Sequence, residues 1–295
     1  MNTQIIGLKR NKTNSNLDKY YTNKNNVDMC LKHFKHAIQQ YGGLSKENDI
    51  IIEPSAGNGA FIDGCKKLCD NCFFYDIEPE HNDIVKQDYL AFNYSTIQNT
   101  GANIHVIGNP PFGRQSSLAI KFIRYSALFS NSISFILPKS FMKESMKSKV
   151  PLNFHLIYET ELEDDNFHVN DTLYNVPCIF QIWIKKNIQR KPFKKLKPNG
   201  YEFVKKEEQH DIAFRRVGVY AGKIYKETTN KSSQSHYFIK FEGGLNDDLY
   251  NNLCEVKFAD RMNTVGPNSI SKQELIKVYN PMINLCKYKK NSNNS

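Results

Sequence analysis

The sequence predicts an α/β fold, in which a mostly parallel sheet flanked by helices is followed by a small C-terminal β-rich region. Along residues 19–186, short runs of β-branched and aromatic residues alternate with amphipathic helical patterns, which is typical of βαβ units. The run Ile50-Ile51-Ile52 leads into the turn Gly57-Asn58-Gly59 and then into a helical pattern. A strand, a glycine-rich turn and a helix in this order build a nucleotide-like site at a strand end.

The first half of this region alternates from its beginning. An amphipathic helix is expected where apolar residues recur on one face between Val27 and Ile38. The runs after the glycine-rich turn predict one helix and two strands, and each of these strands leads to an acidic residue. The expected elements are a strand at Ile50–Ile52, a helix with Phe61, Ile62, Cys65 and Leu68, a strand at Cys72–Ile77 and a short strand at Ile84–Gln87.

The second half continues the alternation and closes the sheet. Pro138 stops one long apolar run, and the run from Cys178 completes a strand pair, so we expect an antiparallel last strand. The expected elements are a strand at Ile104–Ile107, a helix at Ser117–Phe129 with Leu118, Ile120, Ile123, Ala127 and Leu128 on its apolar face, a strand at Ser132–Leu137, a helix beginning within Lys139–Lys149, and strands at Phe154–Tyr158 and Cys178–Ile184.

The rest of the chain has a different composition. Residues 1–18 are polar and residues 287–295 are basic, so both are expected to be disordered tails. Residues 187–199 are rich in lysine and contain two prolines, which predicts a linker. The region between the linker and the basic tail, residues 200–286, is expected to be a small C-terminal module.

This module shows a strand pattern with basic and aromatic positions. Apolar residues alternate with them in Ile212–Tyr225 and in Gln234–Phe241, and polar residues separate the two segments like a turn. Arg215 and Arg216 are candidates for contacting a nucleic-acid target. The alternative is a β-meander whose charges are ordinary solvated positions.

Charge and hydropathy favour some partners and exclude others. The 295 residues include 40 Lys and Arg and 30 Asp and Glu, and the net charge of +10 favours a polyanionic partner. The alternative is a biased composition, because the lysines are spread along the chain. No run approaches about 18 apolar residues and residues 1–18 lack a signal-peptide core, so neither a membrane span nor secretion is expected. Seven cysteines without scaffold spacing indicate a reducing, intracellular compartment.

The tetrad Asn109-Pro110-Pro111-Phe112 follows the apolar run that ends at Ile107. A turn of this kind offers an amide, backbone carbonyls and an aromatic face. The Asn109 side-chain oxygen and the Pro110 carbonyl are suited to accept both N–H groups of an exocyclic amine on a base. Phe112 is suited to stack on that base, which contributes about 1–3 kcal/mol, and the prolines stiffen the loop. The alternative is a simple strand-ending turn.

Three acidic residues follow strands that are close together in the sequence. Glu53 ends the first strand, and Asp76 lies near the end of the next, one βαβ step later. A carboxylate at the position of Asp76 can accept hydrogen bonds from both hydroxyls of a ribose. Asp88 follows the short strand, where it can accept from an adenine amino group.

Together these motifs resemble those of the Rossmann-like class I methyltransferases that use S-adenosylmethionine, specifically the amino-methyltransferases acting on adenine N6. Glu53–Phe61 matches the glycine-rich motif of that family, the tetrad matches its catalytic motif, and Phe167 matches an aromatic residue that packs the target base. The chain departs from the family at Thr22-Asn23-Lys24, where the family has Thr-Pro-Pro. The resemblance implies cofactor contacts by Tyr21, Thr22, Glu53, Ser55, Gly57, Gly59, Asp76, Ile77, Asp88 and Tyr89.

The resemblance implies that a methyl group is transferred to the N6 amine of adenine in nucleic acid, with DNA expected ahead of RNA. RNA adenine methyltransferases share the tetrad, and glutamine-N5 methyltransferases use a similar one that usually ends in tyrosine. Phe112 and the positive charge favour adenine. An inactive nucleic-acid-binding module is a further alternative, against which the intact Gly57, Asp76 and Asn109 argue. The oligomeric state is left open.

Other motifs favour different chemistry only at first sight. Cys65, Cys69 and Cys72 have the spacing of radical iron–sulfur sites, but they fall in a helix and at a strand start, not on one exposed loop. Pro177-Cys178 is a dipeptide of cytosine-C5 methyltransferases, yet it opens a core strand, so Cys178 is interpreted as a packing residue. The histidines lack zinc-ligand spacing with cysteine, and no metal is expected.

Overall fold

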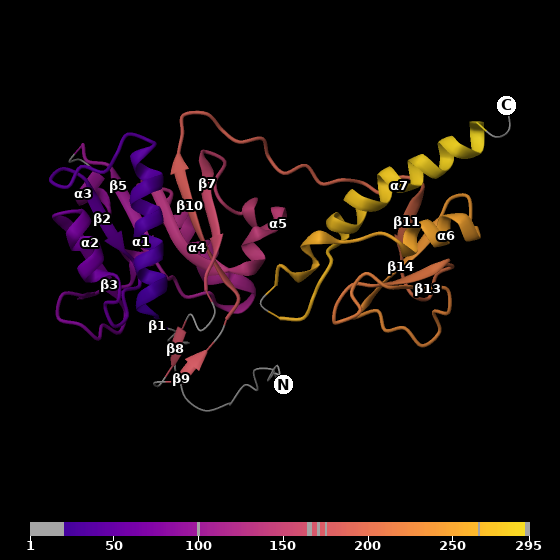
Figure 1. The fold of residues 1–295 in the computed structure, drawn as a ribbon, viewed down its shortest axis with the longest axis horizontal. Coiled ribbons are helices and arrows are strands. Elements are labelled where there is room, and N and C mark those ends of the chain that lie inside the picture. The colour runs from indigo at the N-terminus through magenta and orange to yellow at the C-terminus, as the bar shows by residue number, and fades with distance from the viewer. Residues whose placement is uncertain are drawn as a thin grey trace.

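The computed structural model describes residues 21–98, 101–163, 167–169, 172–174, 176–264 and 266–292. Figure 1 shows a main α/β part in indigo to magenta and a smaller C-terminal part in orange and yellow. Residues 186–200 contain no helix or strand and connect the two parts. The expected tail at residues 1–18 lies outside the described residues. Within those residues, no helix combines the length and the apolar character needed to cross a membrane.

The main sheet has seven strands in the order β4-β3-β2-β5-β6-β10-β7. They are β2 (Ile50–Glu53), β3 (Asn71–Asp76), β4 (Val85–Lys86), β5 (Ile104–Gly108), β6 (Ser132–Pro138), β7 (Phe154–Glu161) and β10 (Cys178–Lys185). The first five are parallel, whereas β10 is antiparallel to both β6 and β7. The predicted sheet is therefore confirmed. Its strand order reverses between β2 and β5, where open α/β sheets bind ligands.

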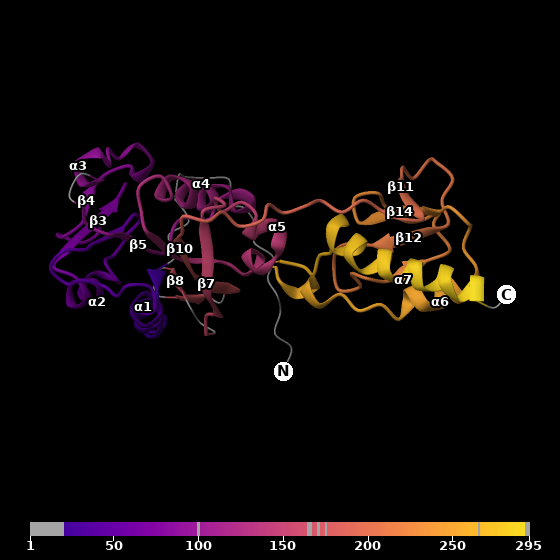
Figure 2. The same cartoon turned by 90° about the horizontal axis from the view of Figure 1, so that it is seen from above.

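Helices cover both faces of this sheet. α1 (Lys24–Gln39) and α2 (Ile62–Leu68) pack on one face, against Ile51 and Phe180. α3 (Ser95–Gln98) and α4 (Ser117–Ser126) pack on the other, against Ile52 and Trp183. Figure 2 shows the two pairs of helices on opposite sides. Because successive side chains point to opposite faces, the continuous apolar runs of these strands supply both cores.

Two helices differ from the prediction. α4 ends at Ser126, earlier than expected, and Leu128 is 55% exposed instead of forming part of the apolar face. The helix expected within residues 139–149 is divided into a 3-10 helix, η3 (Lys139–Met142), and the short α5 (Glu144–Lys147). The division occurs because Lys143, between them, has extended backbone angles.

A small sheet joins the start of the described chain to the segment after β7. It consists of β1 (Tyr21–Thr22), β8 (Phe167–Val169) and β9 (Thr172–Tyr174), in the order β1-β8-β9. Thr22 is paired with Phe167 in the antiparallel register of β1 and β8. The start of the α/β region is thereby brought next to the segment between β7 and β10.

The C-terminal part is an antiparallel sheet covered by helices. Its strands β11 (Tyr201–Val204), β12 (Ile212–Arg215), β13 (Ile224–Tyr225) and β14 (His236–Phe241) are ordered β11-β14-β12-β13. The predicted β-rich region is confirmed, but α6 (Asp247–Cys254), the 3-10 helix η4 (Ala259–Met262) and α7 (Lys272–Ser292) were not predicted. Leu275, Ile276 and Tyr279 of α7 pack on the sheet. α7 also extends into the expected basic tail.

Candidate active site

The loops that follow β2 and β5 lie side by side at the carboxyl ends of these strands. β2 and β5 are adjacent and parallel, with Ile52 paired to Val106, so their ends meet at one edge of the sheet. Across the two loops, Ser55 Oγ donates a hydrogen bond to the Asn109 carbonyl oxygen over 3.1 Å. The structure thus brings the glycine-rich turn and the tetrad together.

Asn109 is held from a second direction by the N-terminal strand. Its Nδ2 donates to Thr22 Oγ1 over 3.3 Å, and Thr22 is 7% exposed. This bond orients the side-chain amide, with the nitrogen toward β1. Asn23, where the chain departs from Thr-Pro-Pro, caps α1 by accepting a hydrogen bond from the Asn26 backbone amide over 2.8 Å.

The other three residues of the tetrad continue the loop at the carboxyl end of β5. Pro110 is buried and Pro111 is half-buried. The half-buried Phe112 ring packs against the cores on both faces of the sheet, so it is fixed in place while part of it stays accessible. Gln115 and Ser116, just beyond, both have left-handed backbone angles, with φ of 54° and 60°. Such strain in non-glycine residues is concentrated at functional sites.

The glycine-rich turn is closed by the acid that ends β3. The Gly57 amide donates to Asp76 Oδ2 over 2.8 Å, and the Glu78 amide donates to Asp76 Oδ1 over 2.8 Å. Gly57 has a φ of +52°, and a Cβ there would lie 3.3 Å from the Tyr21 ring. A side chain at Gly57 would therefore be strained and would press on β1.

Glu80 is a residue of this site that the sequence analysis missed. Its amide donates to the Gly57 carbonyl over 3.0 Å, and its Oε1 accepts from the Tyr21 hydroxyl over 2.6 Å. Tyr21 is thereby attached to the rim of the glycine-rich turn. The sequence carries no signal for a pair that lies 59 positions apart.

Glu53 lies at the end of β2 and is 2% exposed. Within the described part of the chain, its Oε2 has no hydrogen-bond partner. Burial, and then the neighbouring charge of Asp76, raises the pKa of this carboxyl well above its usual value. A buried acid without a partner at a ligand-binding edge is suited to pair with a cationic group of a ligand.

The other expected site residues have mixed positions. Asp88 Oδ1 accepts from the Leu90 amide over 3.0 Å, and Ile77 is 44% exposed beside Asp76. Tyr89 is 1% exposed, and its hydroxyl bonds Ser126 Oγ over 2.7 Å. Its side chain therefore belongs to the core, and the cofactor contact expected of Tyr89 stays a prediction. Phe167 has its backbone in β8, but its side chain lies outside what the structure describes.

Arg215 and Arg216 lie in the C-terminal part, where they hold the backbone. Arg215 Nε donates to the Val217 carbonyl over 2.7 Å. Arg216 Nε and Nη2 both donate to the Gln234 carbonyl, over 3.1 and 2.7 Å. These bonds show that both arginines support the loops around strand β12, and their contact with a target stays a prediction.

The cysteines and histidines do not form a metal centre among the residues that the structure describes, where no group of three or more metal-ligating side chains has a suitable arrangement. Cys65 and Cys69 are both fully buried, and burial raises their pKa values. Cys178 is 2% exposed, and burial likewise raises its pKa. Raised pKa values disfavour the thiolate form that a metal ligand or nucleophile needs.

No protein-family model and no curated sequence matches this chain. Similar solved structures include a proposed RNA methyltransferase from Pyrococcus horikoshii (17% identity, 57% of this chain and 87% of that one, TM-score 0.43). Another is the 23S rRNA methyltransferase ErmE (11% identity, 58% of this chain and 71% of that one, TM-score 0.41). A third is a type I restriction-modification methyltransferase subunit from Streptococcus thermophilus (14% identity, 57% of this chain and 45% of that one, TM-score 0.40). The chain covers less than half of that subunit.

The strand order and the single antiparallel strand β10 are those of the Rossmann-like methyltransferase fold. The predicted fold class is confirmed.

Proposed function

We propose that this protein transfers a methyl group from S-adenosylmethionine to the N6 amine of adenine in nucleic acid, with DNA the favoured substrate. The observation that carries the proposal is the position of Asn109. Ser55 and Thr22 hold its backbone and its side chain directly beside the glycine-rich turn of β2. An acceptor for an amine and a turn for a cofactor are thus next to each other.

The residues at this edge fit the cofactor, which supplies an activated methyl group on a sulfonium. The buried Oε2 of Glu53 lacks a partner among the described residues and would hold the cofactor's ammonium. Gly57 has a left-handed backbone angle, and the Tyr21 ring lies 3.3 Å from where a Cβ would be, so the turn requires glycine at this position. Asp76, already fixed by two backbone amides, would accept from the ribose hydroxyls.

The tetrad would orient the amine. Asn109 Oδ1 and the Pro110 carbonyl would accept its two N–H groups, which favours a pyramidal nitrogen with an available lone pair. Phe112 would stack on the base after the base leaves its helix. The alkylated ammonium is acidic and loses its proton readily, so no strong base is needed. Positioning and oriented dipoles would supply most of the rate acceleration.

DNA is favoured over RNA because the C-terminal part follows the α/β part, an arrangement that resembles adenine methyltransferases with a final target-recognition region. The net charge of +10 supports either polymer. Adenine in RNA and glutamine in protein are the alternative substrates, and the following experiment distinguishes them from adenine in DNA.

The deciding experiment incubates the purified full chain and Asn109→Ala with tritiated cofactor and duplex DNA, single-stranded DNA, total RNA or protein extract. We expect label in DNA, recovered as N6-methyladenine, and its loss in Asn109→Ala while cofactor binding survives. Label only in protein would support glutamine methylation, and label only in RNA would replace DNA. Full turnover by Asn109→Ala would refute the assigned role, and absence of cofactor binding by the wild type would refute the activity.

A further inference from the structure

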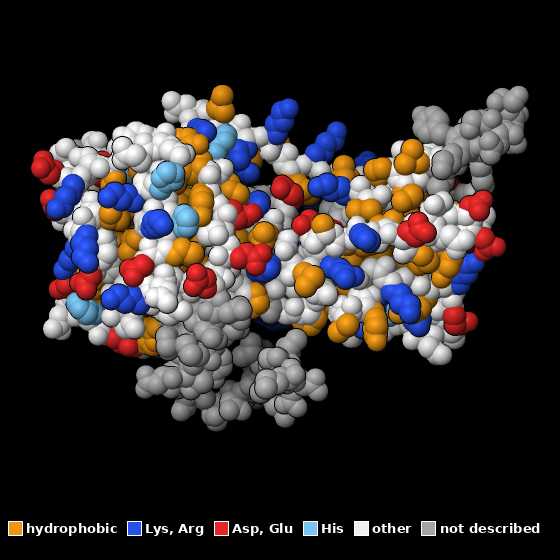
Figure 3. Space-filling model, in the orientation of Figure 1, with side chains coloured by type: hydrophobic (Ala, Val, Ile, Leu, Met, Phe, Trp, Pro, Cys, Tyr) orange, Lys and Arg blue, Asp and Glu red, His pale blue; other side chains and the backbone are white. Residues whose placement is uncertain are grey.

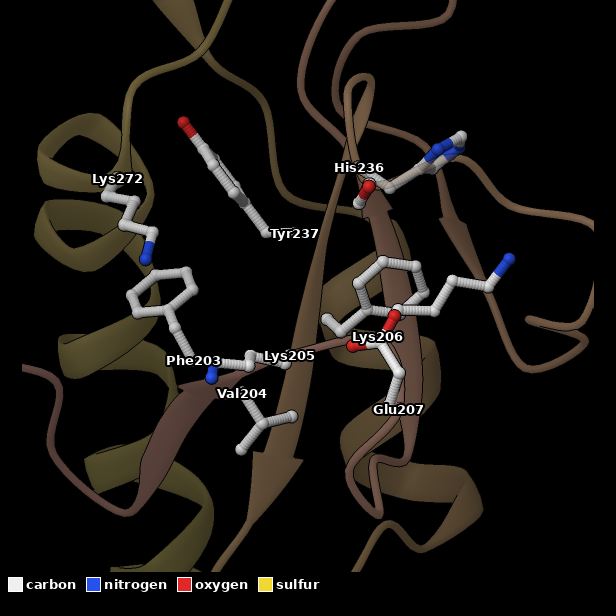
Figure 4. Close-up of a pocket in the computed structure, with 10 residues that line it drawn as sticks. Phe203, Val204, Lys205, Lys206, Glu207, His236, Tyr237 and Lys272 are labelled. Carbon is white, nitrogen blue, oxygen red and sulfur yellow. The ribbon is translucent and has the colours of Figure 1, made fainter.

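The C-terminal sheet has a notch at one edge, where strand β11 ends before its neighbour. The last pair between β11 and β14 is Val204 with Phe238, whereas β14 already begins at His236. A cavity of about 280 Å³ lies at this notch, between the end of β11, the start of β14 and the first turn of α7. Figure 4 shows the side chains around it.

Backbone groups of β14 are directed into the notch. The Glu242 amide donates to the Gly200 carbonyl, so the even-numbered residues of β14 turn their backbone groups toward β11. In β14, His236 is an even-numbered residue that has no partner residue in β11, because the last pair is Val204 with Phe238. Its amide and carbonyl therefore face the side on which β11 has ended, as hydrogen-bonding groups for the edge of a ligand.

Two aromatic rings and a lysine form one wall of the cavity. The rings of Phe203 and Tyr237 are 5.6 Å apart and nearly perpendicular. Lys272 Nζ from α7 lies 4.5 Å from the centre of the Phe203 ring and 5.7 Å from that of Tyr237. In Figure 4, Lys272 reaches down to the Phe203 ring. The Tyr237 hydroxyl donates to the Ile270 carbonyl over 3.3 Å, which fixes its ring.

The opposite side of the cavity is charged. Lys205, Lys206 and Glu207 continue from the end of β11, and Figure 4 shows Lys206 pointing away from the Phe203 ring. With Lys272, three lysines and one carboxylate surround a space beside an aromatic face. Lysines bind phosphate oxygens, and an aromatic face stacks on any base.

We infer that this cavity holds one unpaired nucleotide of a single-stranded nucleic acid, with its base on Phe203 and its phosphate on the lysines. The cavity volume of about 280 Å³ is just below the range of typical small-molecule pockets, which begins near 300 Å³, and it suits a single nucleotide. Lys272 covers the Phe203 ring in this structure, and its flexible chain moves to the phosphate when the base stacks. The inference deepens the proposed function by naming an unpaired stretch as part of the substrate.

The test measures binding by the full chain without cofactor, so it does not depend on methyl transfer. Fluorescent 12-mers of single-stranded DNA and RNA, a duplex 12-mer and competing dAMP are titrated against wild type, Lys272→Gln, Phe203→Leu and Lys223→Gln. Lys223 is the matched control, since it lies just before β13, 5.5 Å from the centre of the Tyr225 ring and 6.0 Å from that of Tyr220, outside the cavity.

We expect Phe203→Leu to weaken single-strand binding about tenfold, in line with the loss of one stacked base. Lys272→Gln should weaken it several-fold and lower the salt slope by about 0.7, the value for one phosphate of a single strand. Lys223→Gln should change it less than twofold. Circular dichroism checks folding, and Lys272→Gln tests the inference by itself if Phe203→Leu is unfolded.

Equal losses in Lys272→Gln and Lys223→Gln would overturn the inference, because they would show charge attraction without a site. Equal sensitivity of duplex binding to these substitutions would also overturn it and would indicate that this face contacts paired DNA. Displacement by dAMP as strong as by the 12-mer would identify a free nucleotide as the ligand, against a strand. Failure of methyl transfer alone would leave the binding result standing.

Discussion

At the scale of single residues, Glu53 combines burial with a carboxyl oxygen that has no partner in the described part of the chain. Burial and the charge of Asp76 raise its pKa, so the folded protein keeps a proton that the unfolded chain releases above about pH 4.3. The stability that this proton contributes is complete below the unfolded pKa. It falls as the pH rises toward the folded pKa.

We therefore expect Glu53→Gln to stabilise the cofactor-free protein relative to wild type, by an amount that grows as the pH rises from about 4.3. The neutral amide keeps the shape of the side chain without a charge to bury. Urea unfolding at several pH values measures the difference, and cofactor binding by the same variant should weaken. A difference that is independent of pH would show that the pKa of Glu53 is the same in the folded and the unfolded protein.

Asp76 differs from Glu53 because both of its oxygens accept backbone hydrogen bonds. We expect Asp76→Asn to weaken cofactor binding about tenfold or more, since an amide can accept at one position only and the Gly57 amide loses its charged partner. Calorimetric titration measures the affinity. Asp83→Asn, which removes an exposed carboxylate paired with Lys66, is the control and should leave it unchanged. Similar losses in both variants would argue against a specific role.

At the scale of elements, the start of α7 connects the two parts of the molecule. Ser271 and Glu274 form a reciprocal cap, with the Glu274 amide donating to Ser271 Oγ over 3.2 Å and the Ser271 amide donating to Glu274 Oε2 over 2.7 Å. Lys143, which divides η3 from α5, pairs with Glu274 at 3.0 Å and donates to the Ser269 carbonyl over 2.8 Å. The Glu274 carboxylate thus caps the start of α7 and also binds Lys143 of the α/β part.

Lys143→Met should uncouple the two parts, because it leaves the Glu274 carboxylate without its positive partner, a loss of about 3 kcal/mol for a buried pair. We expect thermal unfolding to separate into two transitions and residues 186–200 to be cleaved faster by trypsin. Lys147→Met is the matched control, since Lys147 pairs with Glu159 at 3.0 Å inside the α/β part. It should lower stability without separating the transitions, and a separation there too would contradict the role of Lys143.

At the scale of the whole molecule, the positive charge is dispersed. Figure 3 shows lysine and arginine side chains scattered over both parts and mixed with acidic ones on this face. Dispersed charge attracts a polyanion over a distance but does not select a sequence. Under the proposed function, selection of the target would depend on local sites such as the tetrad and the notch at β11.

Binding of nucleic acid should therefore depend strongly on salt. Neutralisation of two phosphates predicts a loss of about tenfold between about 50 and 200 mM salt. Fluorescence anisotropy over a salt series measures the slope, and cofactor affinity over the same series serves as the control. An affinity for DNA and RNA that is constant over this range would argue that the charge of +10 reflects composition and not a polyanionic partner.

The elements of this chain differ in how far the sequence predicts them. The apolar runs that begin at Ile50, Ile104 and Ser132 are rich in isoleucine and are bounded by turn residues, so their strands were predicted closely. The cap Ser271-x-x-Glu274 and the spacing of Leu275, Tyr279 and Ile283 carried a helix signal that was overlooked. The position of Tyr89 beside Asp88 did not predict that its side chain is buried in the core, because that burial depends on tertiary packing.

Local sequence patterns were enough to predict the strand and helix alternation, the antiparallel last strand and the loops at Gly57 and Asn109, because these follow from periodicity and turn chemistry. Which side chains meet depends on the packing of the folded chain. The contacts of Asn109 with Thr22, of Tyr21 with Glu80 and of Lys143 with Glu274 join segments far apart in the chain. Such pairs depend on how separate elements pack, and no local pattern encodes that packing.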